Sequence, residues 1–269
     1  MKNHLKAFTL IELLVVIAVL ALLAATLLPA LAATKPKVQK ITCLNNLKQM
    51  GVAYRLWEGA NSSRYPQAIP ASRGGAFEYC THGGNYSTVG TAALLGYNPG
   101  MVFLVMSNYL INPNLLFCPA DNIHAGAATN FSYGDLLSVV TPAKGQNAPA
   151  LSAYTKVSYF VGADATESDP QSVLAGDCNI GNTGTTGNSP STARFGSTAS
   201  STGSAPEITP NAFGTGAFSW AWTAGDLHQK TGNLLFSDGS VQSATIAGLH
   251  LYMQNATNSV NGPCWNFLP

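Results

Sequence analysis

The sequence predicts an α+β protein in which one long N-terminal helix packs on a small antiparallel sheet with long loops. Residues 8–33 form an apolar run that is long enough to cross a bilayer as a helix. Helical periodicity continues beyond this run to about residue 57. The remaining sequence contains short alternating segments that are separated by Gly, Pro, Ser and Asn, a pattern typical of strands and turns. With 269 residues, the chain can build one sizeable globular domain beyond the helix.

The long helix is expected to run from Phe8 to Trp57 and to have two halves. Residues 8–33 would be the transmembrane half, which lies in lipid or in a bundle of helices. Residues 34–58 would be an amphipathic half that packs under a globular domain of residues 59–269. The amphipathic half is indicated by residues that share one helical face. These residues are Leu44, Leu47, Gly51 and Tyr54.

Glu12 is the only charged residue in the 26 residues from Phe8 to Ala33. A carboxylate near the centre of a membrane helix costs about 3 kcal/mol, so such groups usually have a partner and a function. One interpretation is that Glu12 lies about one turn from the interface and extends towards water. The other is that the chain is cut before Phe8, so that Glu12 pairs with the new amine.

The N-terminus resembles the type IV prepilin signal. A leader of residues 1–7 with two lysines precedes Phe-Thr-Leu-Ile-Glu, which begins at Phe8 and continues into the apolar helix. The resemblance implies cleavage before Phe8 and methylation of its amine by a prepilin peptidase, a role for Glu12 in assembly register, and a kink at Pro29. The residue before the cut is normally Gly in that family. Ala7 is the smallest substitution for it, so we expect cleavage.

Later motifs form a second resemblance. They are Cys43-Leu-Asn-Asn-Leu-Lys-Gln, Cys118-Pro-Ala-Asp, the Leu-Ala-Gly-Asp that ends at Asp177, and His228 with nine residues before Asp238-Gly239. Together they are similar to prepilin-type proteins with an H-x9-DG C-terminal region, found in planctomycetes and verrucomicrobia and related to the major pseudopilins of type II secretion. This resemblance implies a Cys43–Cys118 disulfide, which is one pairing among several from the residues alone.

The other cysteines are Cys80, Cys178 and Cys264. Five cysteines in a chain that leaves the cytoplasm predict disulfides and one remaining thiol. We expect Cys178 to form an additional bridge with Cys80 or Cys264. Cys80 and His82 supply only two metal ligands without a second pair nearby, so we interpret their segment as a surface loop.

The domain is expected to contain several short elements. Residues 101–110 predict a helix that packs on the long one, and residues 115–119 predict a buried strand that ends at proline. Residues 154–162 and 172–177 predict two paired strands, with Val157, Tyr159 and Val161 on one face of the first. Residues 181–216 predict a low-complexity surface insertion.

Asp238-Gly239 is expected to be the turn of a β-hairpin over residues 233–246, because Gly and Asp tolerate positive φ. A weaker alternative is a Ca²⁺ site that uses Asp238 with carbonyl oxygens or with other acids such as Asp177. His228 is expected to hydrogen-bond to this hairpin and so to hold its loop to the sheet. A hydrolytic triad with Asp238 is disfavoured because the chain has no Gly-x-Ser-x-Gly motif, so no enzyme activity is expected.

Composition limits the range of partners. Only 9% of residues are charged and the formal net charge is +1, which becomes −1 when the two leader lysines are removed (11 basic minus 12 acidic residues). A near-neutral surface gives no electrostatic basis for nucleic-acid binding. Basic residues stand on both sides of the apolar run, so orientation rests on the resemblance. It places the C-terminal domain in the periplasm, first on an inner-membrane anchor and later in a periplasmic or extracellular filament.

The resulting hypothesis is a structural pilin or pseudopilin. Its expected partners are other copies of the chain through their N-terminal helices, the prepilin peptidase and an inner-membrane assembly platform. The alternative is a membrane-tethered or secreted extracytoplasmic binding protein that does not polymerise. A secretory signal peptide cleaved at Ala30-Leu31-Ala32 is disfavoured, because the apolar segment exceeds 20 residues and contains Glu12.

Overall fold

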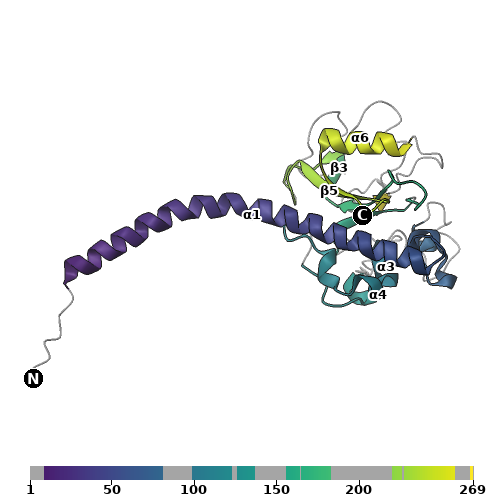
Figure 1. Ribbon diagram of the computed structural model, residues 1–269, viewed down its shortest axis with the longest axis horizontal. Coiled ribbons are helices and arrows are strands. Elements are labelled where there is room, and N and C mark those ends of the chain that lie inside the picture. Colours follow the sequence, from purple (N-terminus) through teal and green to yellow (C-terminus); the bar gives the residue numbers. More distant parts are fainter. Residues whose placement is uncertain are drawn as a thin grey trace, which may run out of the picture.

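The computed structural model shows a long curved helix that leads into a domain of mixed helices and strands (Figure 1). This architecture confirms the predicted α+β class and is pilin-like. The structure describes residues 9–80, 99–122, 126–136, 156–163, 165–182, 220–225, 227–257 and 267–268. Ala7, Phe8, His82, Cys264 and most of the 181–216 insertion therefore lie outside the described residues.

The long helix, α1 (Leu10–Ala60), has 51 residues and is about 75 Å long at ~1.5 Å per residue. It begins at the N-cap Thr9 and ends where Asn61 donates its backbone N–H to the Glu58 carbonyl. The helix is bowed but remains continuous through two prolines, Pro29 and Pro36 (Figure 1). Each proline lacks the N–H that a helix interior requires, which accounts for bending.

Five antiparallel strands form the central sheet, in the order β6-β5-β2-β1-β7. The predicted pairing of residues 154–162 with 172–177 is confirmed, since Tyr159 lies opposite Asp177 in the two inner strands. A second sheet pairs β3 with β4. The strands are β1 (Tyr159–Gly162), β2 (Val173–Asp177), β3 (Ile180–Asn182), β4 (Trp220–Trp222), β5 (Thr231–Phe236), β6 (Val241–Thr245) and β7 (Phe267–Leu268).

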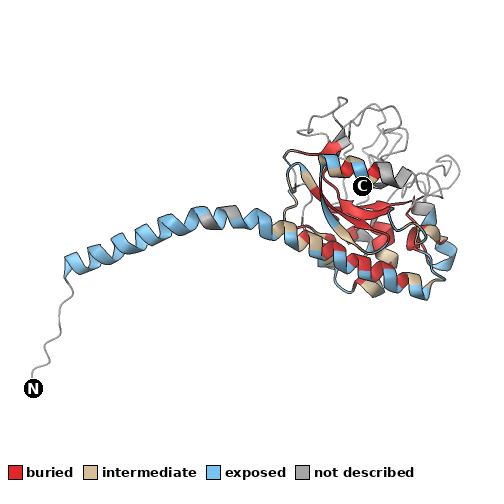
Figure 2. Ribbon diagram, turned by 45° about the horizontal axis from the view of Figure 1, so that its top comes forward, coloured by how far each residue is buried: buried red, intermediate tan, exposed pale blue. Residues whose placement is uncertain are grey.

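The central sheet is covered on both faces. The domain half of α1 packs on one face, and the C-terminal helix α6 (Ile246–Thr257) packs on the other (Figure 1). Side chains alternate between the two cores, because Tyr159 and Val161 face α1 whereas Phe160 faces α6. Burial is therefore concentrated in the sheet and the adjoining half of α1, while the N-terminal half of the helix is exposed (Figure 2).

Short helices surround the domain half of α1. They are the 3₁₀ turns η1 (Pro66–Ala68), η2 (Ala71–Arg73) and η4 (Pro113–Leu116), and the helices α2 (Phe77–Cys80), α3 (Pro99–Val105), α4 (Ser107–Leu110) and α5 (Tyr133–Leu136). The helix predicted over 101–110 is thus two helices, with Met106 between them as the N-cap of α4. Both pack in the core that faces α1.

The strand predicted over residues 115–119 is wrong. The chain forms the turn η4 instead, because Pro113 presets its φ angle and the Asn112 side chain accepts the Asn114 N–H at 3.0 Å. At the end of this turn, Leu116 contacts the residue before β1, since its carbonyl accepts the Ser158 N–H at 2.8 Å. The segment therefore reaches the sheet without joining it as a strand.

The hairpin predicted around Asp238-Gly239 is confirmed by β5 and β6. Gly239 has φ +84°, and Asp238 accepts the Ser240 N–H at 2.7 Å. Gly supplies this left-handed conformation without a steric penalty. The predicted hairpin ended at residue 246, and the structure starts α6 there.

Candidate functional site

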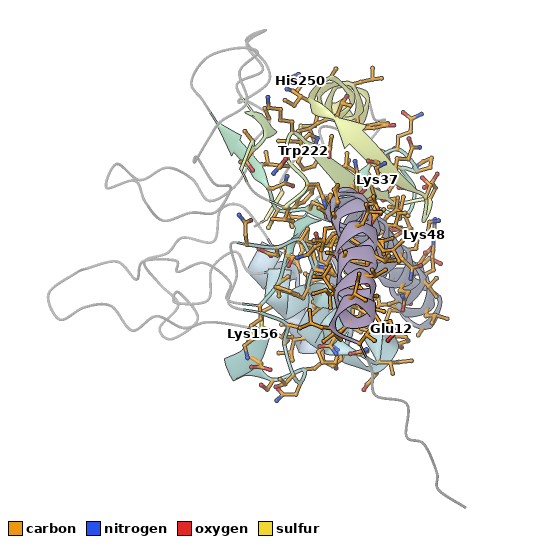
Figure 3. All side chains as sticks on the ribbon, turned by 90° about the vertical axis from the view of Figure 1, so that its left-hand side faces the viewer. Glu12, Lys37, Lys48, Lys156, Trp222 and His250 are labelled. Carbon is orange, nitrogen blue, oxygen red and sulfur yellow. A yellow bond between two sulfur atoms is a disulfide. The ribbon has the colours of Figure 1, made fainter. Side chains whose placement is uncertain are left out.

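Thr9 and Glu12 form a capping box at the start of α1. The Glu12 carboxylate accepts hydrogen bonds from the Thr9 N–H at 2.9 Å and the Thr9 hydroxyl at 2.7 Å. In return, the Thr9 hydroxyl accepts the Glu12 N–H at 3.3 Å. Viewed along α1, Glu12 lies on the exposed surface of the helix (Figure 3). Both residues follow the predicted cut, so cleavage before Phe8 would leave this cap in place.

The apolar half of α1 extends away from the domain. Leu10–Pro29 is a 20-residue candidate membrane span with a mean hydropathy of 2.8, and none of it is buried. Leu10, at its first position, is 81% exposed. A stretch of this length and composition matches the hydrocarbon thickness of a bilayer, which fits membrane anchoring. Pro29 stands at its end, inside the continuous helix.

The domain half of α1 is joined to the segment around Cys118 by a disulfide and by hydrogen bonds. Cys43 and Cys118 form the disulfide that the family resemblance implied, with Cα atoms 5.1 Å apart and both residues fully buried. Gln39 donates to the Pro119 carbonyl at 2.8 Å, and Asn46 donates to the Phe117 carbonyl at 3.0 Å. These contacts fix the helix against the domain near the place where its burial begins.

A buried polar cluster adjoins this disulfide. His228 Nε2 lies 3.4 Å from Cys118 Sγ and 3.5 Å from Asp177 Oδ2. Asp177 Oδ2 accepts two hydrogen bonds from Asn233, from the backbone N–H at 2.7 Å and the side-chain amide at 3.0 Å. His228 thus meets the sheet at Asp177 in β2, and not at the β5–β6 hairpin to which a hydrogen bond was expected. Asp238 is not part of the contact.

Burial controls the protonation of this cluster. It raises the pKa of Asp177 to about 7, although the Asn233 hydrogen bonds and the Lys40 ammonium act in the opposite direction. Burial, with a further contribution from the positive charge of Lys40, lowers the pKa of His228 to about 4. The imidazole is therefore neutral at pH 7, where the carboxyl is about half ionised. Burial also lowers the pKa of Lys40, whose ammonium donates to Thr231 Oγ1 at 3.1 Å.

The loop that carries His228 has an unusual backbone. Leu227, Gln229 and Lys230 have φ angles of +42°, +46° and +58°, in the left-handed region that residues with a Cβ seldom adopt. Asn122 stabilises this conformation, since its side chain accepts the Leu227 N–H at 3.2 Å and donates to the Gly225 carbonyl at 3.1 Å. The segment that follows Cys118 therefore also holds the loop that brings His228 to Cys118.

The suggested Ca²⁺ site that combines Asp177 with Asp238 is wrong. Asp177 hydrogen-bonds to Asn233 near the start of β5, whereas Asp238 lies in the turn after its end. The strand residues from Asn233 to Phe236 alone, at ~3.3 Å per residue, separate these positions by roughly 10 Å, and the turn follows them. One cation cannot contact both carboxylates across that distance.

The additional disulfide predicted between Cys178 and Cys80 is also wrong. Both residues are buried thiols. Cys80 lies at the end of α2, in the core that faces α1, whereas Cys178 directly follows β2. The alternative partner Cys264 and the neighbouring His82 lie outside the described residues.

Sequence reasoning identified Asp177 and His228 but missed Asn233, Asn122 and Lys40. Asn233 gave one detectable signal, because it is a polar residue directly before the apolar Leu-Leu-Phe run of β5, and the structure buries it completely. Buried polar groups are normally hydrogen-bonded, so such a residue indicates a nearby partner. Asn122 and Lys40 gave no comparable signal, since both stand in polar surroundings.

Comparison with known proteins gives one match. Residues 2–28 match the family described as the prokaryotic N-terminal methylation motif. No curated protein and no solved structure matches the chain. The match covers the leader, Glu12 and most of the candidate membrane span, and the H-x9-DG resemblance stays a prediction.

Proposed function

We propose that this chain, which carries the methylation signal of pilin-like proteins, is a structural subunit of a pilus-like filament. In this proposal a prepilin peptidase removes residues 1–7 and methylates Phe8, and the subunits then assemble through their N-terminal helices. The filament would be a type II secretion pseudopilus or a type IV pilus-like fibre. One observation carries the proposal. The methylation motif lies on an exposed apolar helix, and this helix continues without interruption into the domain.

The environment of this helix supports assembly. On extraction from lipid, the apolar half must be covered again, because exposing so much apolar surface to water is unfavourable. A bundle of identical helices would cover it. Glu12 would then lie in a dry environment, where an ion pair with the Phe8 amine of its own or a neighbouring chain favours one register, since mispairing leaves a buried charge without a partner.

The domain half of α1 has a second apolar stripe that no described residue covers. Its members, at 60%, 55%, 61% and 66% exposure, are Val52, Leu56, Val38 and Ile41. At 100° per residue these four lie within about 60° of one another and opposite the buried face that includes Cys43 and Tyr54. This position suits contact with neighbouring subunits outside the bundle of apolar halves.

The proposed localisation is the inner membrane, with the domain in the periplasm before assembly, and then the filament. The proposed role is structural and not catalytic. His228 supports this assignment, because its Nε2 faces a disulfide and a carboxylate. A hydrolytic triad would require that nitrogen to contact a nucleophile.

The first experiment is mass spectrometry of the N-terminal peptide of the protein recovered from cells. A peptide that begins at methylated Phe8 is expected. A peptide that begins near Ala33 would mean that a secretory signal peptide was removed, and would overturn the filament proposal.

The second experiment compares Glu12→Ala with Glu12→Gln. Gln retains the acceptor and donors of a capping box but removes the charge. If the ion pair sets the register, both variants should insert into the membrane and neither should assemble. Normal filaments from Glu12→Gln would show that helix capping, and not charge, is the role of Glu12. A membrane-tethered binding protein would be unaffected by either change.

A further inference from the structure

Four residues from distant segments meet at one buried point beside α1. They are Cys43 on α1, Cys118 after η4, Asp177 at the end of β2, and His228 in the loop before β5. Each of the four belongs to a different one of the later sequence motifs. The sequence indicated no shared chemical role for these motifs. Their side chains are almost completely enclosed, with 2% exposure for His228 and none for Asp177.

We propose that these four side chains bind one Zn²⁺-like cation when the Cys43–Cys118 disulfide is reduced to two thiols. Metal binding and the disulfide would then exclude each other. The ligand set would be two thiolates, the imidazole Nε2 and one carboxylate oxygen. Thiolate sulfur, imidazole nitrogen and carboxylate oxygen are all ligands that Zn²⁺ takes in proteins. The proposal does not depend on filament assembly.

The observed separations match such a site. Zn–S, Zn–N and Zn–O bonds of ~2.3, ~2.05 and ~2.1 Å with tetrahedral angles place S and N ~3.6 Å apart and N and O ~3.4 Å apart. The corresponding distances here are 3.4 Å from Cys118 Sγ to His228 Nε2 and 3.5 Å from Nε2 to Asp177 Oδ2. The two sulfurs and one nitrogen of His228 all lie within 4.8 Å of one another, and Asp177 adjoins this group of three through His228. Reduction would allow the sulfurs to move apart to the ~3.8 Å that tetrahedral coordination requires.

The surroundings would orient these ligands. Both Asn233 hydrogen bonds go to Oδ2 of Asp177 and fix the orientation of the carboxylate, as outer groups do for carboxylates that bind metals. The second oxygen, Oδ1, is buried and has no hydrogen-bond partner among the described residues. Thr231 donates to the His228 carbonyl at 2.8 Å. Three left-handed residues around His228 are the kind of backbone strain that accumulates at functional sites.

Charge balance also favours the site. Two thiolates, one carboxylate and a divalent cation sum to −1. The Lys40 ammonium, which interacts electrostatically with Asp177, brings the local sum to zero. A buried ionic group is tolerated when its charges are paired in this way.

Oxidation would exchange the two states. The Cys43 and Cys118 thiolates would each give one electron to a disulfide-class oxidant, which becomes two thiolates. The Cys43–Cys118 bond would form, and the cation would leave with its charge unchanged.

The test uses the full chain in detergent, reduced with a phosphine, with Co²⁺ as the probe. We expect one Co²⁺ per chain, a thiolate-to-cobalt charge-transfer band, displacement by Zn²⁺, and release when an oxidised dithiol is added. The variants His228→Gln and Asp177→Asn should each bind at least ~10-fold more weakly, because losing even a group that only orients a ligand costs that much. The matched controls Cys80→Ser and Cys178→Ser should bind normally.

Fluorescence of the buried Trp57 and Trp222, recorded before Co²⁺ is added, establishes that the domain of each reduced variant remains folded. A folded, reduced chain that binds no Co²⁺, or binds it without the thiolate band, would overturn the proposal. Unchanged binding by His228→Gln and Asp177→Asn would also overturn it, as would loss of binding in the Cys80 or Cys178 controls.

Discussion

The Cys43–Cys118 disulfide closes a loop across a sequence separation of 75 residues, and this length gives a quantitative prediction. In the chain-entropy account, a loop of ~75 residues lowers the entropy of the unfolded chain by about 15 cal/mol/K, or ~4.5 kcal/mol at 25 °C. Typical domains unfold with only about 5–15 kcal/mol. Replacing both cysteines by serine should therefore remove a large share of the stability.

The assay is reversible urea unfolding of the full chain in mild detergent with a chelator present, so that bound metal does not contribute. Fluorescence of the buried Trp57 and Trp222 reports on both sides of the sheet. With a slope of about 2 kcal/mol/M, the double variant should unfold at a midpoint ~2 M lower than the oxidised protein. Reduced wild-type protein should show a similar shift.

The matched control is Cys178→Ser, which changes a buried thiol outside the disulfide. Its midpoint should move by less than ~0.5 M, equivalent to ~1 kcal/mol. A double variant whose midpoint lies within ~0.5 M of the oxidised protein would refute the loop-closure reasoning. The reasoning would also be refuted if the midpoint of Cys178→Ser fell by as much as that of the double variant.

Three further predictions concern the sheet and its polar cluster. Gly232→Ala would place a Cβ 2.4 Å from the Trp222 ring and should cost about 1–3 kcal/mol in urea unfolding. Gly239→Ala has space for its Cβ but an unfavourable φ of +84°, so it should cost about 1 kcal/mol, and a stability gain would contradict the turn assignment. Asp177→Asn should change the pH dependence. In the native protein, the raised pKa of Asp177 makes the free energy of unfolding decrease as the pH rises from 4 to 7. The lowered pKa of His228 makes the same free energy increase as the pH rises from 4 to 6.5. The two effects largely offset each other. In Asp177→Asn only the His228 effect remains, so the free energy of unfolding should decrease by up to ~3 kcal/mol as the pH falls from 6.5 to 4. A flat profile would contradict this assignment.

Sequence patterns predicted the helices and turns whose conformation depends mainly on neighbouring residues. The α1 helix follows from an uninterrupted apolar run and its periodic continuation, and the Asp238-Gly239 hairpin follows from the φ that Gly supplies. The prediction for residues 115–119 failed because apolar content was weighed above the preference of Asn112 and Pro113 for a turn. The helix α6 was missed because its apolar residues directly continue the strand pattern of β6.

The buried cluster could not be predicted in the same way. His228 and Cys118 are 110 residues apart, and no periodicity relates residues at that separation. Family resemblance supplied the Cys43–Cys118 pair and marked Asp177 and His228, but it did not indicate that they meet. That convergence depends on strand order and on a loop with positive φ angles at three non-glycine residues, and both are properties of the folded chain.

The position of Cys43 on α1 has a mechanical consequence. It is the first residue of the helix that is completely buried, so it stands at the edge where the helix leaves the domain. A pulling force on the exposed half would concentrate at that edge and tend to peel the helix from the sheet, contact by contact. The disulfide places a covalent bond at the position where peeling would begin. Tension would therefore pass directly into the Cys118 segment, and the apolar contacts between α1 and the sheet would carry little load.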